Sequence, residues 1–150
     1  MDVHATVELA RPAADVFVWV DDLDRYPRWT SLVHKVVPSE PEPDGAPAWI
    51  VELRARVGPM ARSKRLRMVR TVHDAPNCAV FERRELDGRD HSPWILTVEL
   101  GAGDDGGTSV GVDLHYGGGL WTGGLLERAL SDQITDGSRR LDELVSGRTR

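Results

Sequence analysis

At 150 residues, the chain has the length of one domain, and its 40% hydrophobic and 29% charged residues are typical of a globular protein. The net charge of -5 argues against general binding to nucleic acid or to an anionic membrane, because both favour a basic protein. No apolar run approaches the roughly 20 residues that a membrane-spanning helix needs. We therefore expect a single domain over residues 1–150, with no nucleic-acid partner and no stable membrane insertion.

Cys78 is the single cysteine, so no internal disulfide can form. The first ten residues, MDVHATVELA, lack the basic start and apolar core of a signal peptide. Both features are typical of a protein of the reducing cytoplasm, where we expect this chain to reside.

The N-terminal part of the chain changes from a period of two to a helical period. Apolar and polar residues alternate over residues 3–9, which predicts a half-buried strand. Pro12 suits the first turn of a helix, and the apolar residues over 13–23 recur at helical spacing. A second helical piece over 24–29 is interrupted by Pro27. Two short helices therefore follow the first strand.

Alternation dominates the chain from there to residue 116. A polar, proline-rich loop over 38–47, which we expect to be mobile, separates the second strand from the third. The later connections are short, which favours antiparallel hairpins with one apolar face. The strands expected after the two helices cover residues 32–37, 49–57, 64–73, 78–85, 94–100 and 108–116. Basic side chains gather over 62–67 (RSKRLR), which we interpret as the solvated face of a strand rather than a phosphate site.

Beyond the glycines of 117–124, the period becomes helical up to the C-terminus. The apolar positions make one stripe, and charged residues occupy the other side. This is the only element long enough to cover the apolar face of the sheet. The sequence therefore predicts an α+β domain in which a curved antiparallel sheet of about seven strands wraps around a long C-terminal helix. The stripe consists of Leu126, Leu130, Ile134, Leu141, Leu144 and Val145.

With this order of elements, the chain resembles the START-like superfamily, also called SRPBCC, and within it the polyketide cyclase/dehydrase and lipid-transport branch. The resemblance covers essentially the whole chain. It implies the helix-grip fold and a cavity between the sheet and the last helix, but it fixes no single function, because the superfamily includes lipid carriers, hormone receptors and polyketide aromatase/cyclases. The segments that carry it are RPAADVFVWVDDLDRYPRW, APNCAVFERRE, DDGGTSVGVDLHY and YGGGLWTGGLLERAL.

Arg70 is the first candidate for chemistry. Strand alternation places it on the face of Leu66 and Met68, which we assign to the cavity. Val72 is expected on the same face. A guanidinium there could hold a carboxylate or polarise a carbonyl, and an arginine of polyketide aromatase/cyclases that Arg70 loosely matches is thought to act in this way. A bulge or a one-residue shift of the strand would instead place Arg70 in solvent.

Large aromatic residues on the inward faces could form a pocket for a flat ligand, or could simply pack in the core. Tyr116 also carries a hydroxyl that could orient a ligand, although a hydrogen bond to the backbone would explain it equally well. If the protein is an enzyme, Arg70 and Tyr116 are the best catalytic candidates. The residues expected to line the ligand site are Trp49, Leu53, Met68, Arg70, Phe81, Trp94, Leu96, Tyr116, Leu126 and Gln133.

Two glycine features allow two interpretations each. The glycines around Trp121 could form a hinged gate, or a turn that folds the last helix back over the sheet. Gly137 could leave room for a ligand beneath the helix, or relieve a close approach to a bulky strand residue. The five histidines show no metal-ligand spacing, so we expect neither a metal nor a cofactor.

Three hypotheses for function follow. The first is binding of a small hydrophobic or aromatic molecule, lipid-like or polyketide-like, by a monomer or homodimer. The second is a polyketide aromatase/cyclase that positions its substrate and transfers protons. The third is a noncatalytic protein-interaction module with a filled core.

Overall fold

The computed structural model describes residues 2–57, 59–117 and 125–147, without the side chains of 55–57, 125–131 and 134. In this part of the chain, seven strands form one sheet in the order β1-β7-β6-β5-β4-β3-β2, and every neighbouring pair is antiparallel. The expected antiparallel sheet is thus confirmed. The strands are β1 (Asp2–Leu9), β2 (Val33–Ser39), β3 (Ala48–Val57), β4 (Met60–Asp74), β5 (Cys78–Arg83), β6 (Trp94–Ala102) and β7 (Thr108–Tyr116).

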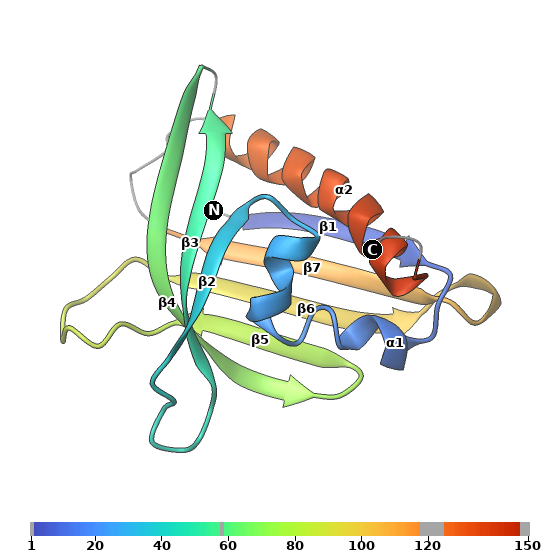
Figure 1. Cartoon of the computed structure of the whole chain (residues 1–150), viewed down its shortest axis with the longest axis horizontal. Helices are drawn as coiled ribbons and strands as arrows, with labels where there is room; N and C mark the ends of the chain where they lie inside the picture. Colours follow the sequence, from blue (N-terminus) through green and yellow to red (C-terminus); the bar gives the residue numbers. More distant parts are fainter. Residues whose placement is uncertain (1, 58, 118–124, 148–150) are drawn as a thin grey trace.

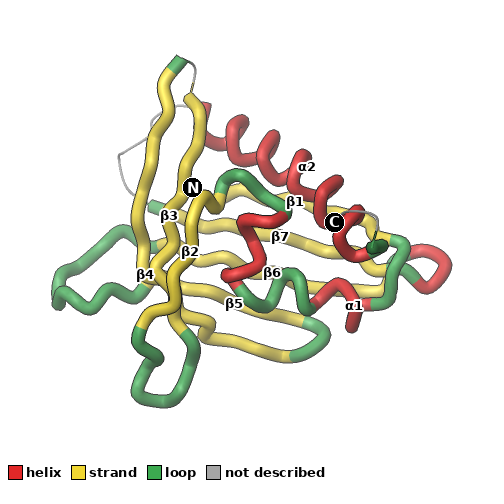
Figure 2. Tube along the Cα trace, in the orientation of Figure 1, coloured by secondary structure: helices red, strands yellow, loops and turns green. Residues whose placement is uncertain are grey.

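The helices lie on the concave side of the curved sheet (Figure 1). The long helix α2 (Leu125–Val145) crosses that side and contacts β1 and β3. The short α1 (Ala13–Phe17) and the 3₁₀ helix η1 (Leu23–Arg28) follow β1, as predicted, and cover the other part of this face (Figure 2). A further 3₁₀ turn, η2 (Asp104–Gly106), joins β6 to β7. This arrangement is the expected helix-grip fold.

Helix α2 is pressed closely against the end of η1 at Gly137. A Cβ atom added there would lie 2.9 Å from the carbonyl oxygen of Trp29 and 3.2 Å from the Cβ of Thr30. Of the two interpretations of Gly137, the structure favours relief of a close approach. The neighbour is the loop after η1 rather than a bulky strand residue.

A bulge in β4 changes which residues face the helices. Arg70 pairs with Phe81 and Val72 pairs with Val80, so Thr71 is the extra residue. Val72 is 43% exposed, and its predicted place on the apolar face is wrong because the bulge reverses the alternation beyond Arg70. The reversal also brings His73 toward the helices.

The prediction that residues 62–67 form a solvated face is wrong for Arg67, whose side chain is only 2% exposed. It lies on the convex face, where the start of the proline-rich loop folds over it. Its Nε donates to the Ser39 hydroxyl at 3.2 Å, and its Nη2 donates to the Glu40 carbonyl at 2.7 Å. Its Nη1 donates to the Arg84 carbonyl at 2.9 Å. Arg67 therefore fastens this loop to the middle of β4 and to the end of β5.

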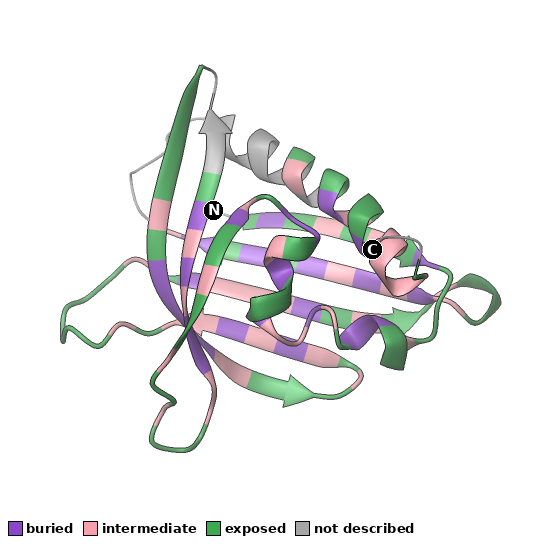
Figure 3. Ribbon diagram, in the orientation of Figure 1, coloured by how far each residue is buried: buried purple, intermediate pink, exposed green. Residues whose placement is uncertain are grey.

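The core lies between the sheet and the helices, and buried residues follow the strands beneath α2 and η1 (Figure 3). Leu66, Phe81 and Val98 on the sheet are at most 1% exposed, and Val16 and Leu141 complete the core from the helices. This core forms the floor and walls of the site described next.

Candidate ligand cavity

An apolar cavity lies between η1 and the concave face of the sheet. Its volume is about 80 Å³, and the empty space including its mouth, which is open to solvent, is about 680 Å³. Its described walls come from η1 and the segment after it, and from β2, β3, β4, β6 and β7. The lining residues are Leu23, Tyr26, Trp29, Thr30, Leu32, Val33, Val51, Leu53, Leu66, Met68, Trp94, Leu96, Val112 and Leu114.

Strand register explains why these residues converge. Val51 lies opposite Leu66 across β3 and β4, and Leu96 lies opposite Leu114 across β6 and β7. Because side chains two residues apart in a strand point to the same face, each pair of strands contributes a row of aliphatic groups. The result is a wall with almost no polar atoms.

Two polar side-chain groups of the lining are engaged with backbone carbonyls, whereas the Nε1 of Trp94 has no acceptor. The Tyr26 hydroxyl donates to the Val20 carbonyl at 2.7 Å, and the Trp29 Nε1 donates to the Trp19 carbonyl at 3.0 Å. Burial, and after it the negative charges of nearby aspartates, raises the pKa of Tyr26 far above its ordinary value. Tyr26 therefore stays protonated and is a poor proton-transfer group.

Four of the predicted ligand-site residues line the cavity: Leu53, Met68, Trp94 and Leu96. The others lie around it or elsewhere. Trp49 and Phe81 pack edge-to-face at 5.9 Å in the adjoining core. Tyr116 stacks on Trp94 with 5.0 Å between ring centroids and is not part of the described lining.

Arg70 lies on the concave side, opposite Phe81, because the bulge comes after it. Its Nη1 nevertheless donates to the Asp21 carbonyl at 2.8 Å, and its Nε is buried without a partner. Next to it, His73 contacts the Asp21 carboxylate at 3.0 Å and stacks on Phe17. Arg70 thus holds the connection between α1 and η1 and is not in the described lining of the cavity.

The remaining predictions concern the C-terminal region. The Leu126 side chain, residues 118–124 and the proposed gate around Trp121 lie outside the described residues. Gln133 is partly buried, and its Oε1 accepts a hydrogen bond from the Ser31 hydroxyl. It ties α2 to the segment after η1.

Sequence reasoning missed the wall that η1 and the following segment contribute. Tyr26 and Trp29 are three residues apart, which places both rings on one side of a helical turn. That spacing was the available signal, but the proline within the segment concealed it.

Within the described residues, no group of three or more His, Cys, Asp and Glu side chains could hold a metal ion. Burial, followed by the nearby carboxylates of Glu99 and Asp74, raises the pKa of the Cys78 thiol. The thiol is therefore poorly suited to act as a nucleophile. Nor does any helix in the described part of the chain have the length and apolar character needed to cross a membrane.

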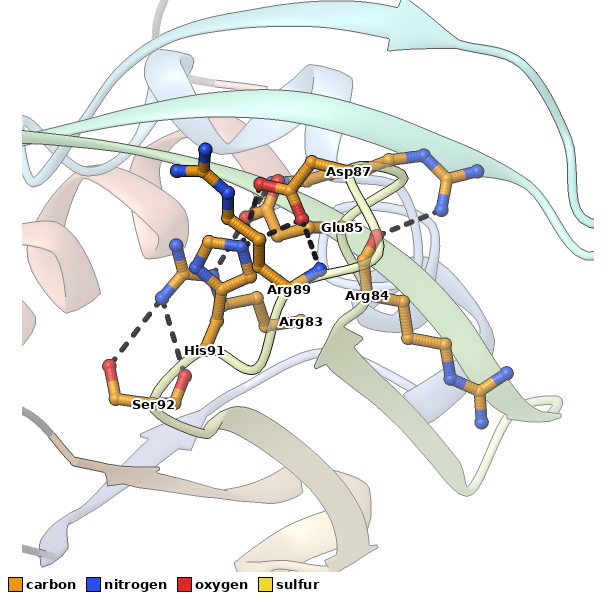
Figure 4. A network of polar contacts seen from close by, with 8 residues as sticks. Arg83, Arg84, Glu85, Asp87, Arg89, His91 and Ser92 are labelled. Carbon is orange, nitrogen blue, oxygen red and sulfur yellow. Dashed lines mark hydrogen bonds and ion pairs between the residues drawn. The ribbon is translucent and has the colours of Figure 1, made fainter.

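Charged side chains lie near Trp94, at one end of the cavity, and come from Lys64, Arg83 and Glu85. The Arg83 side chain is 10% exposed, and its Nε donates to the Glu85 carboxylate at 2.7 Å. Its Nη1 reaches the carbonyl and hydroxyl oxygens of Ser92 at 3.3 and 3.5 Å (Figure 4). The Lys64 ammonium lies 5.9 Å from the centroid of the Trp94 ring.

A curved antiparallel sheet that grips a long helix over an apolar cavity defines a START-like, helix-grip protein. The family model described as "Polyketide cyclase / dehydrase and lipid transport" matches residues 1–146, and the chain belongs to this family. No curated protein matches the chain.

Solved structures share the fold at low sequence identity. A START superfamily protein from Mycobacterium smegmatis is 16% identical, with 99% of each chain covered and a TM-score of 0.73. A protein from Thermus thermophilus is also 16% identical, with 100% of each chain covered and a TM-score of 0.75. The di-domain ARO/CYC StfQ from the steffimycin biosynthetic pathway is 17% identical, with 98% of this chain and 51% of that chain covered and a TM-score of 0.68.

Proposed function

We propose that the protein binds a small, mainly apolar molecule in the cavity between η1 and the sheet. The observation that carries the proposal is the chemistry of the walls. They are aliphatic and aromatic, and the polar atoms of Tyr26 and Trp29 are turned to backbone carbonyls. Such a surface favours apolar contact over hydrogen bonding. We include in this proposal a single domain over residues 1–150, a cytoplasmic location and a monomer or homodimer.

The volume limits how the ligand enters. Ligand pockets commonly measure roughly 300–1,000 Å³, which exceeds the 80 Å³ of this cavity. A ligand therefore places part of its apolar body inside and the rest in the open mouth, or pushes the walls apart. Met68 is suited to such adjustment, because its unbranched side chain adapts to irregular spaces.

The cyclase hypothesis has less support. Its two catalytic candidates are not in the described lining, since Arg70 holds the Asp21 carbonyl and Tyr116 stacks on Trp94. Tyr26, which does line the cavity, keeps its proton. The similarity to an ARO/CYC protein supports the fold alone. The hypothesis of a protein-interaction module predicts a filled core, and the apolar cavity makes this hypothesis less favoured.

Titration with the neutral fluorescent amine N-phenyl-1-naphthylamine tests the proposal. We expect fluorescence enhancement and saturable binding to the wild-type protein. Leu96→Trp fills the cavity and should weaken binding about tenfold or more, which is a change of about 1.4 kcal/mol. Thr97→Trp, which puts the same ring on the opposite face of β6, should bind like the wild type.

Absence of binding to the wild-type protein, or equal binding to Leu96→Trp and Thr97→Trp, would overturn the proposal. Thermal unfolding of each variant establishes that it is folded. Native mass spectrometry of the protein purified without denaturant then gives the mass of any ligand retained from the cell.

A further inference from the structure

Lys64 stands at the border of the cavity. It lies on the concave face of β4, two residues before Leu66, and in register with Leu53 of β3. Both of these residues line the cavity, as does Trp94, whose ring lies beneath the Lys64 ammonium at 5.9 Å. That distance is within the range of a cation–π contact. The chain therefore places a cation at the end of an otherwise apolar wall.

This cation has no acidic partner among the described residues. The carboxylate of Glu85, whose charge acts on Lys64, is held by Arg83 at 2.7 Å (Figure 4). Lys64 forms no ion pair within 4.0 Å in the described part of the chain, whereas Arg83 is paired with Glu85. Burial and then repulsion from Arg83 lower the pKa of Lys64, and Glu85 offsets part of this effect. An additional anion would relieve the imbalance.

A second observation points to the same place. Trp94 is 3% exposed, and its Nε1 is buried without a hydrogen-bond acceptor. Buried N–H groups in proteins nearly always have an acceptor, and this one belongs to a residue of the cavity wall, so a ligand oxygen that reached it would satisfy it. A carboxylate has two acceptor oxygens and could serve both an N–H donor and an ammonium.

We propose that the region of Lys64, Arg83 and Trp94 binds the anionic head of the ligand, so that the ligand is an amphipathic molecule with an apolar body and a terminal carboxylate. This inference rests on the proposed function and names its ligand class. The protein as a whole carries a charge of -5, so a positive region of this kind is local and selects for the head group at one end of the cavity.

Isothermal titration calorimetry with decanoate and 1-decanol tests the inference, because the two probes share a chain and differ in the head. We expect the wild-type protein to bind decanoate about tenfold more tightly, a factor that one charge-assisted contact can supply. Raising the salt concentration should reduce this preference, since exposed charges are screened.

Three variants locate the effect. Lys64→Gln should lose the preference for decanoate and keep its affinity for decanol. Lys64→Arg, which retains the charge, should keep the preference. Arg65→Gln is the matched control, because Arg65 is the next residue of β4 and is exposed on the opposite face.

Equal affinity of the wild-type protein for the two probes would overturn the inference, and so would equal weakening of both by Lys64→Gln. In either case, binding of the neutral naphthylamine would still support the cavity as a ligand site. Failure of both ten-carbon probes to bind would also overturn the inference, whereas the proposed function stands or falls with the naphthylamine titration.

Discussion

Replacing Arg67 by methionine tests whether a buried arginine holds the convex face together. The change keeps most of the side-chain volume and removes the guanidinium. It leaves the carbonyl oxygens of Glu40 and Arg84 without the donors that now lie 2.7 and 2.9 Å away. The Glu42 carboxylate loses a partner at 3.5 Å and, among the described residues, retains its ion pair with Arg84.

The magnitude follows from these contacts. Leaving an acceptor without its donor costs about 1–3 kcal/mol when it is buried, and breaking a buried ion pair on one side costs about 3–5 kcal/mol in all. Glu40 and Arg84 are exposed residues, so water replaces part of the lost hydrogen bonds. The Glu42 side chain is 16% exposed, so water partly compensates for its loss. We expect Arg67→Met to lower the free energy of unfolding by about 3 kcal/mol, a large part of the roughly 5–15 kcal/mol of a typical domain.

Urea unfolding followed by tryptophan fluorescence measures this loss. Arg65→Met is the control, since Arg65 is exposed two residues earlier, and its free energy of unfolding should change by less than about 0.5 kcal/mol. Amide hydrogen exchange over residues 40–47 should quicken in Arg67→Met alone. A loss below about 1 kcal/mol in Arg67→Met would refute the reasoning, because it would fall within what a single ordinary hydrogen bond contributes.

Three further predictions concern close contacts and pH. Gly137→Ala should lower the melting temperature, because the Cβ of the alanine would lie 2.9 Å from the Trp29 carbonyl oxygen. Such overpacking costs about 1–3 kcal/mol, which exceeds the gain in helix propensity. An unchanged or higher melting temperature would contradict this prediction. Gly107→Ala should also destabilise the protein by about 1–3 kcal/mol, because the Cβ of the alanine would lie 2.5 Å from the Leu9 carbonyl oxygen. If urea unfolding gave the variant the same free energy of unfolding as the wild type, the clash would be excluded. Burial raises the pKa of Tyr26, so the unfolded chain releases this proton near pH 10 while the folded protein keeps it. The free energy of unfolding should then fall by up to about 1.4 kcal/mol per pH unit above about pH 10, and Tyr26→Phe should remove this part of the slope in urea titrations across the alkaline range.

The sheet and its closing helix could be predicted because alternation and helical spacing are local properties of the sequence. The same alternation placed Leu53, Met68, Trp94 and Leu96 on the side where the cavity lies. Their role in binding stays a prediction, to be decided by ligand titration.

What could not be predicted depends on contacts between distant segments. Arg67 is buried because a loop 25 to 28 residues away in the chain folds over it, and nothing in RSKRLR indicates that cover. The partner of Arg70 is the carbonyl of Asp21, which is 49 residues away. The bulge at Thr71 has no proline or glycine to mark it, and it alone turns Val72 outward.

The β3–β4 hairpin reaches beyond the other strands of the sheet (Figure 1). Among the described residues, 55–57 and 60–62 pair only with each other, so the outward N–H and C=O groups of both strands have no neighbouring strand there. The exposed guanidinium groups of Arg54, Arg62 and Arg65 surround that edge. Mutual repulsion of these like charges opposes edge-to-edge association of two copies, and high salt, which weakens the repulsion, would remove part of the protection against aggregation.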